Sequence, residues 1–247
     1  MRSQHIAATP MKPDWDKTGD CPALLDGEVH VWLAHVPSAR AHLNELAALL
    51  SSDERERAAR FRFEPHRERS QIARGLLRSL LARYTQSEAE TLCFAYNQYG
   101  KPELRSCDVF FNTSHSGDYV ALGFTRAGAV GVDIEQIRGE MSRHEAIARR
   151  YFAPGEQRQL ASRPESERAT AFFHLWTCKE AFVKARGDGL FSGLDQFETA
   201  LDGSRVVSIG GVPASGWWMS SLPEVPNYAG AVVVNTSACR PRFWKWK

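Results

Sequence analysis

The spacing of apolar residues divides the first half of the chain into strands and helices. Between residues 28 and 36, Val29, Val31 and Leu33 occupy every second position, which predicts a strand. Helical spacing predicts helices over 42–50 and 66–84. Ser51 and Glu54 match a capping box, which predicts a short helix from there to about residue 60, between the two longer ones. Three more strands are predicted, at 91–96, 108–112 and 119–124.

The second half repeats this order of elements. A strand is predicted at 129–135, a helix at 145–152, a short helix opened by Pro154, and a long helix over 167–186 that Gly187 ends. Strands are predicted to follow at 197–201, 205–209, 216–220 and 229–235. The repetition predicts a pseudo-duplicated α+β protein with halves at 28–127 and 128–236. An irregular segment, 1–27, precedes them, and a basic, aromatic tail, 237–247, follows with no role that the pattern assigns.

Composition narrows the classes of protein. The 247 residues carry a net charge of only +2, which argues against a general nucleic-acid binder. Five cysteines, an odd number without a C-x-x-C pair, argue against a disulfide framework or a zinc site and favour a reducing cytoplasm. The first 27 residues lack the apolar core of a secretory signal, and no apolar run reaches the length of a membrane span. We therefore expect a cytoplasmic protein without a membrane or nucleic-acid partner.

Two charged clusters carry the candidate chemistry. Asp133 and Glu135 lie two apart on a predicted strand, so both carboxylates share one face and repel each other unless a cation relieves them. Glu180 and Lys184 lie one turn apart on the long helix, which is apolar over much of its circumference. A metal ion and a phosphate would provide partners for these charges. Taken singly, each cluster is also typical of a solvated strand end or a surface ion pair.

Two further segments indicate anion binding. The sequence Asn112 to Asp118 is predicted to form a hairpin loop that exposes Ser114 and His115 as donors. A serine hydrolase is a poor interpretation, because no G-x-S-x-G elbow is present. Upstream, Tyr99 to Pro102 is predicted to form a rigid turn that presents Lys101. Both segments, taken in isolation, are equally consistent with ordinary polar surface turns.

Together these segments resemble the Sfp-type 4'-phosphopantetheinyl transferases. The likeness rests on 99–102, 111–117, 131–135 and 176–190, in order and at matching spacing over roughly residues 28–235. Thr113 departs from the aliphatic residue that is more usual there, and the Arg-rich stretch of the first half matches loosely. The resemblance implies a pseudo-dimeric monomer with the active site between its halves. It also implies transfer of phosphopantetheine from coenzyme A to a serine of an apo carrier protein, releasing adenosine 3',5'-bisphosphate.

The resemblance also implies roles for particular residues. Mg²⁺ would be held by three acids, Asp133, Glu135 and Glu180. Glu180, with Lys184 and Asp133 as the other catalytic residues, would take the proton from the carrier serine. Lys184 and Ser114 would contact the pyrophosphate of coenzyme A. His115, Arg57 and Ser70 would contact its 3'-phosphate. Lys101 would lie at the adenine nucleotide, and Arg74 is a further candidate for a phosphate contact. Elementary chemistry agrees, since a pyrophosphate attacked by an alcohol needs charge neutralisation and a proton acceptor.

Two other classes of function stay open at the level of sequence. A non-catalytic module that binds coenzyme A or a carrier protein would not need the three acids, which are all present. A metal-dependent phosphodiesterase or nuclease also uses a D-x-E pair, but would cut its substrate without a carrier. The choice among fatty-acid, polyketide and nonribosomal-peptide carriers is equally open. The resemblance places the carrier-facing surface near 137–150.

Overall fold

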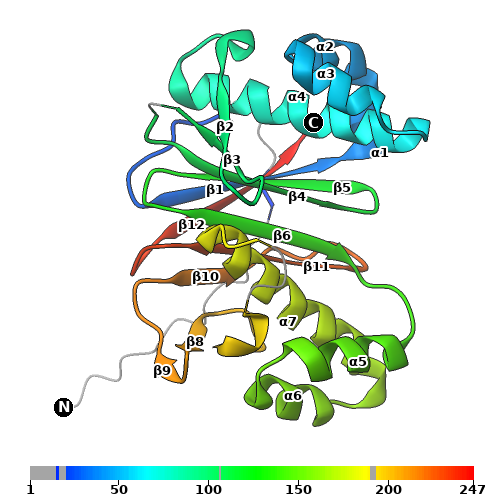
Figure 1. The fold of residues 1–247 in the computed structure, drawn as a ribbon, viewed down its shortest axis with the longest axis vertical. Helices are drawn as coiled ribbons and strands as arrows, with labels where there is room; N and C mark the ends of the chain where they lie inside the picture. The colour runs from blue at the N-terminus through cyan, green and yellow to red at the C-terminus, as the bar shows by residue number, and fades with distance from the viewer. Residues whose placement is uncertain (1–14, 17–20, 106, 190–192) are drawn as a thin grey trace, which may run out of the picture.

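Two β-sheets lie face to face in the middle of the protein, and helices cover the outer face of each sheet (Figure 1). The computed structural model describes residues 15–16, 21–105, 107–189 and 193–247. The first sheet has the order β12 (Arg240–Trp246), β1 (Glu28–His35), β5 (Tyr119–Thr125) and β4 (Phe110–Ser116). The second sheet has the order β10 (Trp218–Ser221), β11 (Tyr228–Val234) and β6 (Val130–Gln136). All neighbours are antiparallel except β12, which runs parallel to β1.

The helices form two outer layers. Above the first sheet lie α1 (Val36–Ala39), α2 (Leu43–Ala48), α3 (Ser52–Ala59) and α4 (Glu64–Thr85) (Figure 1). Below the second lie α5 (Met141–Tyr151), α6 (Pro154–Ala161) and α7 (Glu165–Arg186) (Figure 1). Small hairpins complete each half: β2 (Phe94–Tyr96) with β3 (Pro102–Leu104), and β7 (Phe197–Thr199) with β8 (Val206–Ile209) and β9 (Val212–Pro213). Among the described residues, no helix is both long enough and apolar enough to span a bilayer.

The period of two on the strands builds the core. Val29, Val31 and Leu33 of β1 face the second sheet, where they meet Val132 and Ile134 of β6. The intervening residues of β1, such as Trp32, point to the opposite face and pack against α4. Because each sheet is covered on both faces, its strands bury apolar side chains on both sides.

The two halves repeat one topology, as the order of sequence patterns predicts. In the first half, β1 pairs with β5 and β5 with β4; in the second, β6 pairs with β11 and β11 with β10. Each half inserts shorter helices, α1 to α3 in the first half and α5 and α6 in the second, and then one helix of 22 residues after its first strand. The capping box at Ser51 and Glu54 is present at the start of α3. The prediction of a pseudo-duplicated α+β fold is confirmed.

Three segments differ from the sequence predictions. The expected loop over 112–118 is wrong, because β4 continues through Ser116 and only Gly117 and Asp118 form the turn. The strand expected at 91–96 begins at Phe94, after a 3-10 turn at Ala89–Thr91. The tail, which the pattern left without a role, forms β12 and buries Phe243 and Trp244. Leu190, part of the motif after α7, and much of 1–27 lie outside the described residues.

Candidate active site between the two halves

Side chains, rather than a backbone ladder, join β4 to β6 along the line where the halves meet. Three oxygens of β4 each accept a hydrogen bond from a backbone N–H of β6. Asn112 Oδ1 accepts from Val132 at 2.9 Å, Ser114 Oγ from Ile134 at 3.4 Å, and Ser116 Oγ from Gln136 at 3.1 Å. The strand is therefore polar on its β6-facing side, which gives its sequence the composition of a loop. We call this line of contact the seam.

The same serines hold the paired acids of β6. Ser114 Oγ donates to Asp133 Oδ1 at 2.7 Å, and Ser116 Oγ donates to Glu135 Oε2 at 2.6 Å. Each hydroxyl thus accepts from the backbone and donates to a carboxylate, which fixes the position of both groups. Asp133 and Glu135 share one strand face, as their spacing predicts.

A glycine brings α7 close to these acids. Gly131 lies on the same face of β6 as Asp133, and a Cβ at this position would overlap the carbonyl oxygen of Ala181 and the backbone nitrogen of Ala185. The close approach of α7 to β6 places Lys184 beside the acids. Its Nζ lies 2.5 Å from Asp133 Oδ1 and donates to Ser114 Oγ at 2.9 Å.

Glu180 completes a cluster of three acids. Its side chain is only 4% exposed, and its Oε1 has no hydrogen-bond partner among the described residues, like Oδ2 of the equally buried Asp133. Burial, and then the charges of Asp133 and Glu135, raise the pKa of Glu180 to about 7. Burial also raises the pKa of Glu135. These carboxylates repel one another, and Lys184 offsets only part of that charge.

The cluster suits a hard divalent cation. Buried polar atoms normally have partners, so two unpaired carboxylate oxygens mark a place where a ligand is expected. Carboxylate oxygens are the donors that Mg²⁺ prefers. As they are arranged in the described part of the chain, no three or more His, Cys, Asp or Glu side chains form a group that could hold a metal ion. The fit therefore rests on the unpaired oxygens and on the mutual repulsion of the acids.

In addition to the acidic cluster, a pocket of about 290 Å³ lies between α4 and β4, and we call it the second pocket. Ser70 and Arg74 of α4 and His115 of β4 line it, as does Arg69, which sequence reasoning missed. Burial lowers the pKa of His115, and the positive charges of Arg69 and Lys184 add to this effect. The walls therefore offer guanidinium, hydroxyl and imidazole donors, the set that recognises a phosphate.

Two of the sequence candidates lie at the edge of this pocket. The guanidinium of Arg57 stacks 4.7 Å from the ring centre of Tyr96, which is itself part of the pocket wall. Lys101 lies in an adjoining cavity of about 250 Å³, but its ammonium points inward. Its Nζ donates to the carbonyls of Val130, Lys184 and Ala185, at 2.6–3.3 Å, so it caps the C-terminal end of α7. The turn forms, but it does not present a free lysine.

The structure thus gathers the sequence candidates into two groups. Asp133, Glu135, Glu180, Lys184 and Ser114 form the acidic cluster, and the second pocket contains Ser70, Arg74 and His115. Sequence reasoning missed the seam residues Asn112 and Ser116, although the alternation N-x-S-x-S could have indicated a strand with one polar face.

The pKa of Glu180 predicts how stability depends on pH without divalent ions. Between its ordinary pKa of 4.5 and about 7, the unfolded chain releases this proton and the folded protein keeps it. The folded state then binds more protons, so raising the pH through this range lowers the free energy of unfolding, by up to about 3 kcal/mol. Urea denaturation of wild type and Glu180→Gln in EDTA should show this as a pH-dependent difference. Parallel pH profiles would contradict it.

Comparisons with known proteins agree with this geometry. A family model described as the 4'-phosphopantetheinyl transferase superfamily matches residues 129–233, and one described as 4'-phosphopantetheinyl transferase, N-terminal, matches 36–126. The chain is 37% identical to the 4'-phosphopantetheinyl transferase HetI of Nostoc sp. over 90% of this chain and 94% of HetI. It is 32% identical to the 4'-phosphopantetheinyl transferase Sfp of Bacillus subtilis, over 70% of this chain and 76% of Sfp.

Proposed function

Because this chain belongs to the 4'-phosphopantetheinyl transferase superfamily, we propose that the acidic cluster and the second pocket together bind Mg²⁺ and coenzyme A for transfer to a carrier protein. The chain is an enzyme of this family and transfers the phosphopantetheine group to carrier proteins. The unpaired, buried oxygens of Glu180 and Asp133 are the observation that carries the proposal. Both halves of the site come from one chain, which supports a monomeric enzyme.

The acidic cluster would serve the transfer step. Asp133, Glu135 and Glu180 are the residues that would hold Mg²⁺, which supplies charge neutralisation at the pyrophosphate of coenzyme A. Glu180 accepts the proton of the carrier serine, directly or through a water, as the serine oxygen attacks the phosphorus of the pantetheine phosphate. Lys184 would donate to the pyrophosphate, and Ser114 could join it only by releasing the hydrogen bond that its hydroxyl donates to Asp133. Adenosine 3',5'-bisphosphate then leaves.

The second pocket would hold the nucleotide end of coenzyme A. Ser70 and His115 line it, and Arg57 stacks on Tyr96 of its wall, so we expect these three to contact the 3'-phosphate dianion. Arg74 adds a further guanidinium. Lys101 lines the adjoining cavity, so its side chain would lie near the adenine nucleotide. Its ammonium would not contact the nucleotide, because it is bonded to backbone carbonyls.

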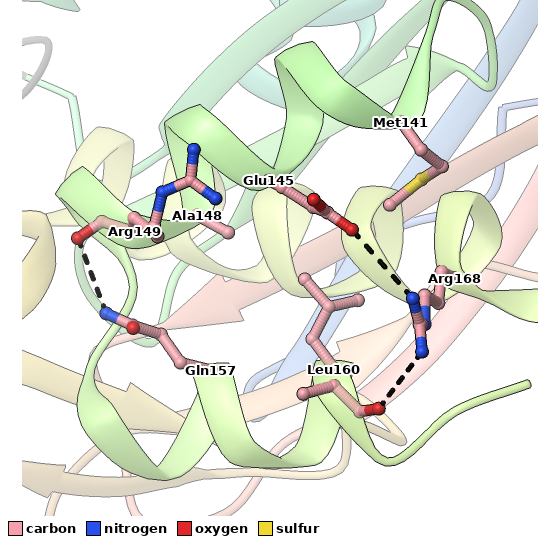
Figure 2. A pocket seen from close by; sticks show the side chains of 8 residues that line it. Met141, Glu145, Ala148, Arg149, Gln157, Leu160 and Arg168 are labelled. Carbon is pink, nitrogen blue, oxygen red and sulfur yellow. Dashed lines mark hydrogen bonds and ion pairs between the residues drawn. The ribbon is translucent and has the colours of Figure 1, made fainter. Parts of the chain in front are cut away.

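A groove between α5 and α6 supports the carrier-facing surface expected near 137–150. Met141 and Ala148 of α5 and Leu160 of α6 line a pocket of about 240 Å³. Figure 2 shows these side chains together with the charged residues around them. Charged groups form its rim, with Arg168 3.9 Å from Glu145. An apolar floor with a charged rim suits a protein surface rather than a small anion. We expect the carrier to contact this groove when its serine reaches Glu180.

One assay tests the proposed function. The protein is incubated with coenzyme A, Mg²⁺ and each of several apo carrier proteins, and the carriers are weighed by mass spectrometry. A mass gain equal to phosphopantetheine, absent when EDTA replaces Mg²⁺, is the expected result. No gain on any carrier would overturn transfer. Hydrolysis of coenzyme A or of nucleic acid without a carrier would point instead to a phosphodiesterase.

His115→Ala should weaken coenzyme A binding by about tenfold, because it removes one donor to the 3'-phosphate. Calorimetry with coenzyme A measures this without carrier or turnover. His35→Ala is the control and should bind like wild type, because this partly buried histidine contacts Ser38 and the ring of Tyr119 and does not line the second pocket. Equal affinity of the two variants would rule out the role of His115.

A further inference from the structure

A completely buried ion pair ties α7 to the rest of the second half. Lys179 Nζ lies 2.6 Å from Glu156 Oε2 and donates to the carbonyl of Phe197 at 2.8 Å. Both charged side chains have no exposed surface. Glu156 Oε2 also accepts the N–H of Ala153, and its Oε1 accepts the N–H and the hydroxyl of Thr199. One pair therefore joins α6, α7 and β7.

The first half contains the same arrangement. Arg78 Nε lies 2.6 Å from Glu54 Oε2, and Arg78 Nη1 donates to the carbonyl of Ala89 at 2.6 Å. Glu54 Oε2 also accepts the N–H of Ser51. The side chains of this pair are only 2% and 3% exposed. Its carboxylate has one further partner, Arg74, whose Nε lies 3.0 Å from Oε1.

The two pairs occupy equivalent places in the duplicated fold. Each carboxylate is the third residue of a short helix, α3 or α6, and closes the N-terminus of that helix. Each cation lies fourteen residues after the first residue of a 22-residue helix, α4 or α7. Each cation also donates to a backbone carbonyl near the next strand. The residue after Arg78 is Ser79, whereas the residue after Lys179 is Glu180, so only the second half has an acid there.

A buried ion pair is a poor source of stability, because desolvation offsets most of the attraction, whereas its geometry is strict. Lys179 is next to Glu180 in the chain, so a bond that fixes the rotation of α7 also fixes the direction of Glu180. In the first half, Glu54 holds Arg74, which lines the second pocket. The fixed groups thus belong to different parts of the site: the base in one half and a phosphate contact in the other.

We propose that the two buried pairs are positioning devices with separate effects on the reaction. Glu156 and Lys179 fix the direction of the Glu180 side chain and so control the rate of the transfer step. Glu54 and Arg78 fix the position of the Arg74 guanidinium and so control the affinity for coenzyme A. This inference rests on the proposed function. All four side chains are buried and bonded to protein groups, so each acts through its neighbour.

Two double variants test the separation. Glu156→Gln with Lys179→Met removes both charges of one pair and leaves no buried charge unpaired. Glu54→Gln with Arg78→Met removes both charges of the other pair and leaves Arg74, whose side chain is 18% exposed, without its carboxylate partner. We expect the first to lower kcat by roughly tenfold to a hundredfold with the Kd for coenzyme A unchanged. We expect the second to raise the Kd by about tenfold with a smaller change in kcat.

Melting temperatures separate positioning from stability. If the pairs were only structural, each double variant would shift the melting temperature without the split between kcat and Kd, and the proposal would be wrong. The exposed pair Arg163 and Glu167, altered as Arg163→Met with Glu167→Gln, is the control and should match wild type. If wild type transfers nothing, the proposed function fails instead. The Kd for coenzyme A, measured by calorimetry, then still tests the role of the Glu54 and Arg78 pair.

A milder change decides the matter if the second-half double variant does not fold. Thr199→Val is close to isosteric and removes only the hydroxyl bond to Glu156 Oε1, 2.9 Å long. It should lower kcat several-fold and leave the Kd for coenzyme A at its wild-type value. Wild-type kcat in a folded Thr199→Val protein would overturn the role of the Glu156 and Lys179 pair.

Discussion

Glu180→Gln should reduce the rate of phosphopantetheine transfer by roughly 10²–10⁴-fold, because it removes the proposed proton acceptor and a proposed ligand of Mg²⁺. The fold should survive, because glutamine has the same shape and removes one of three crowded acids. Stability at neutral pH should even rise, since the pKa of Glu180 shows that its charged form is unfavourable where it lies.

The comparison that decides this prediction is with Glu167→Gln. Glu167 lies in the first turn of the same helix, but it is exposed. Turnover by mass spectrometry, with circular dichroism to check the fold, should separate the two variants. Transfer by Glu180→Gln at the rate of Glu167→Gln would remove both assigned roles of Glu180.

Gly131→Ala should be nearly as damaging, although it changes no functional group. The added methyl would overlap backbone atoms of Ala181 and Ala185, which cannot turn aside as a side chain can. The helix must therefore move away from β6, at a cost of about 1–3 kcal/mol in stability. A displacement of about 1 Å at the reacting groups is enough to lower turnover roughly 10²-fold.

Gly123→Ala is the matched control for this change. Gly123 also lies within a strand, β5, but a Cβ there would meet Val130 and Val132 side chains at 3.5 Å, which is ordinary contact. Turnover and melting temperature should fall in Gly131→Ala and stay near wild type in Gly123→Ala. If Gly131→Ala keeps full turnover, the close approach of α7 is not what positions Glu180 and Lys184.

The parts of the site that could be predicted from sequence are those set by local geometry. Asp133 and Glu135 share a face because strands repeat every two residues, and Glu180 and Lys184 share one because helices repeat every 3.6. An apolar face at helical spacing likewise predicts α4, and a long, largely apolar segment that Gly187 ends predicts α7.

The parts that could not be predicted depend on distant partners. Asn112, Ser114 and Ser116 look like a polar turn until β6 supplies N–H groups for them. Lys101 looks like a surface lysine until the carbonyls at the end of α7 approach it. No local pattern records either partner.

The position of β12 has a consequence for how the chain folds. This strand comes from the last residues of the described chain, yet it pairs in register with β1, with Glu28 opposite Arg240. About two hundred residues separate these partners, so the contact closes a very long loop and forms late. During synthesis the first sheet keeps an open edge until the entire second half has emerged. The two halves resemble each other in topology, but because β12 joins them through the first sheet, we expect them to fold as a single cooperative unit.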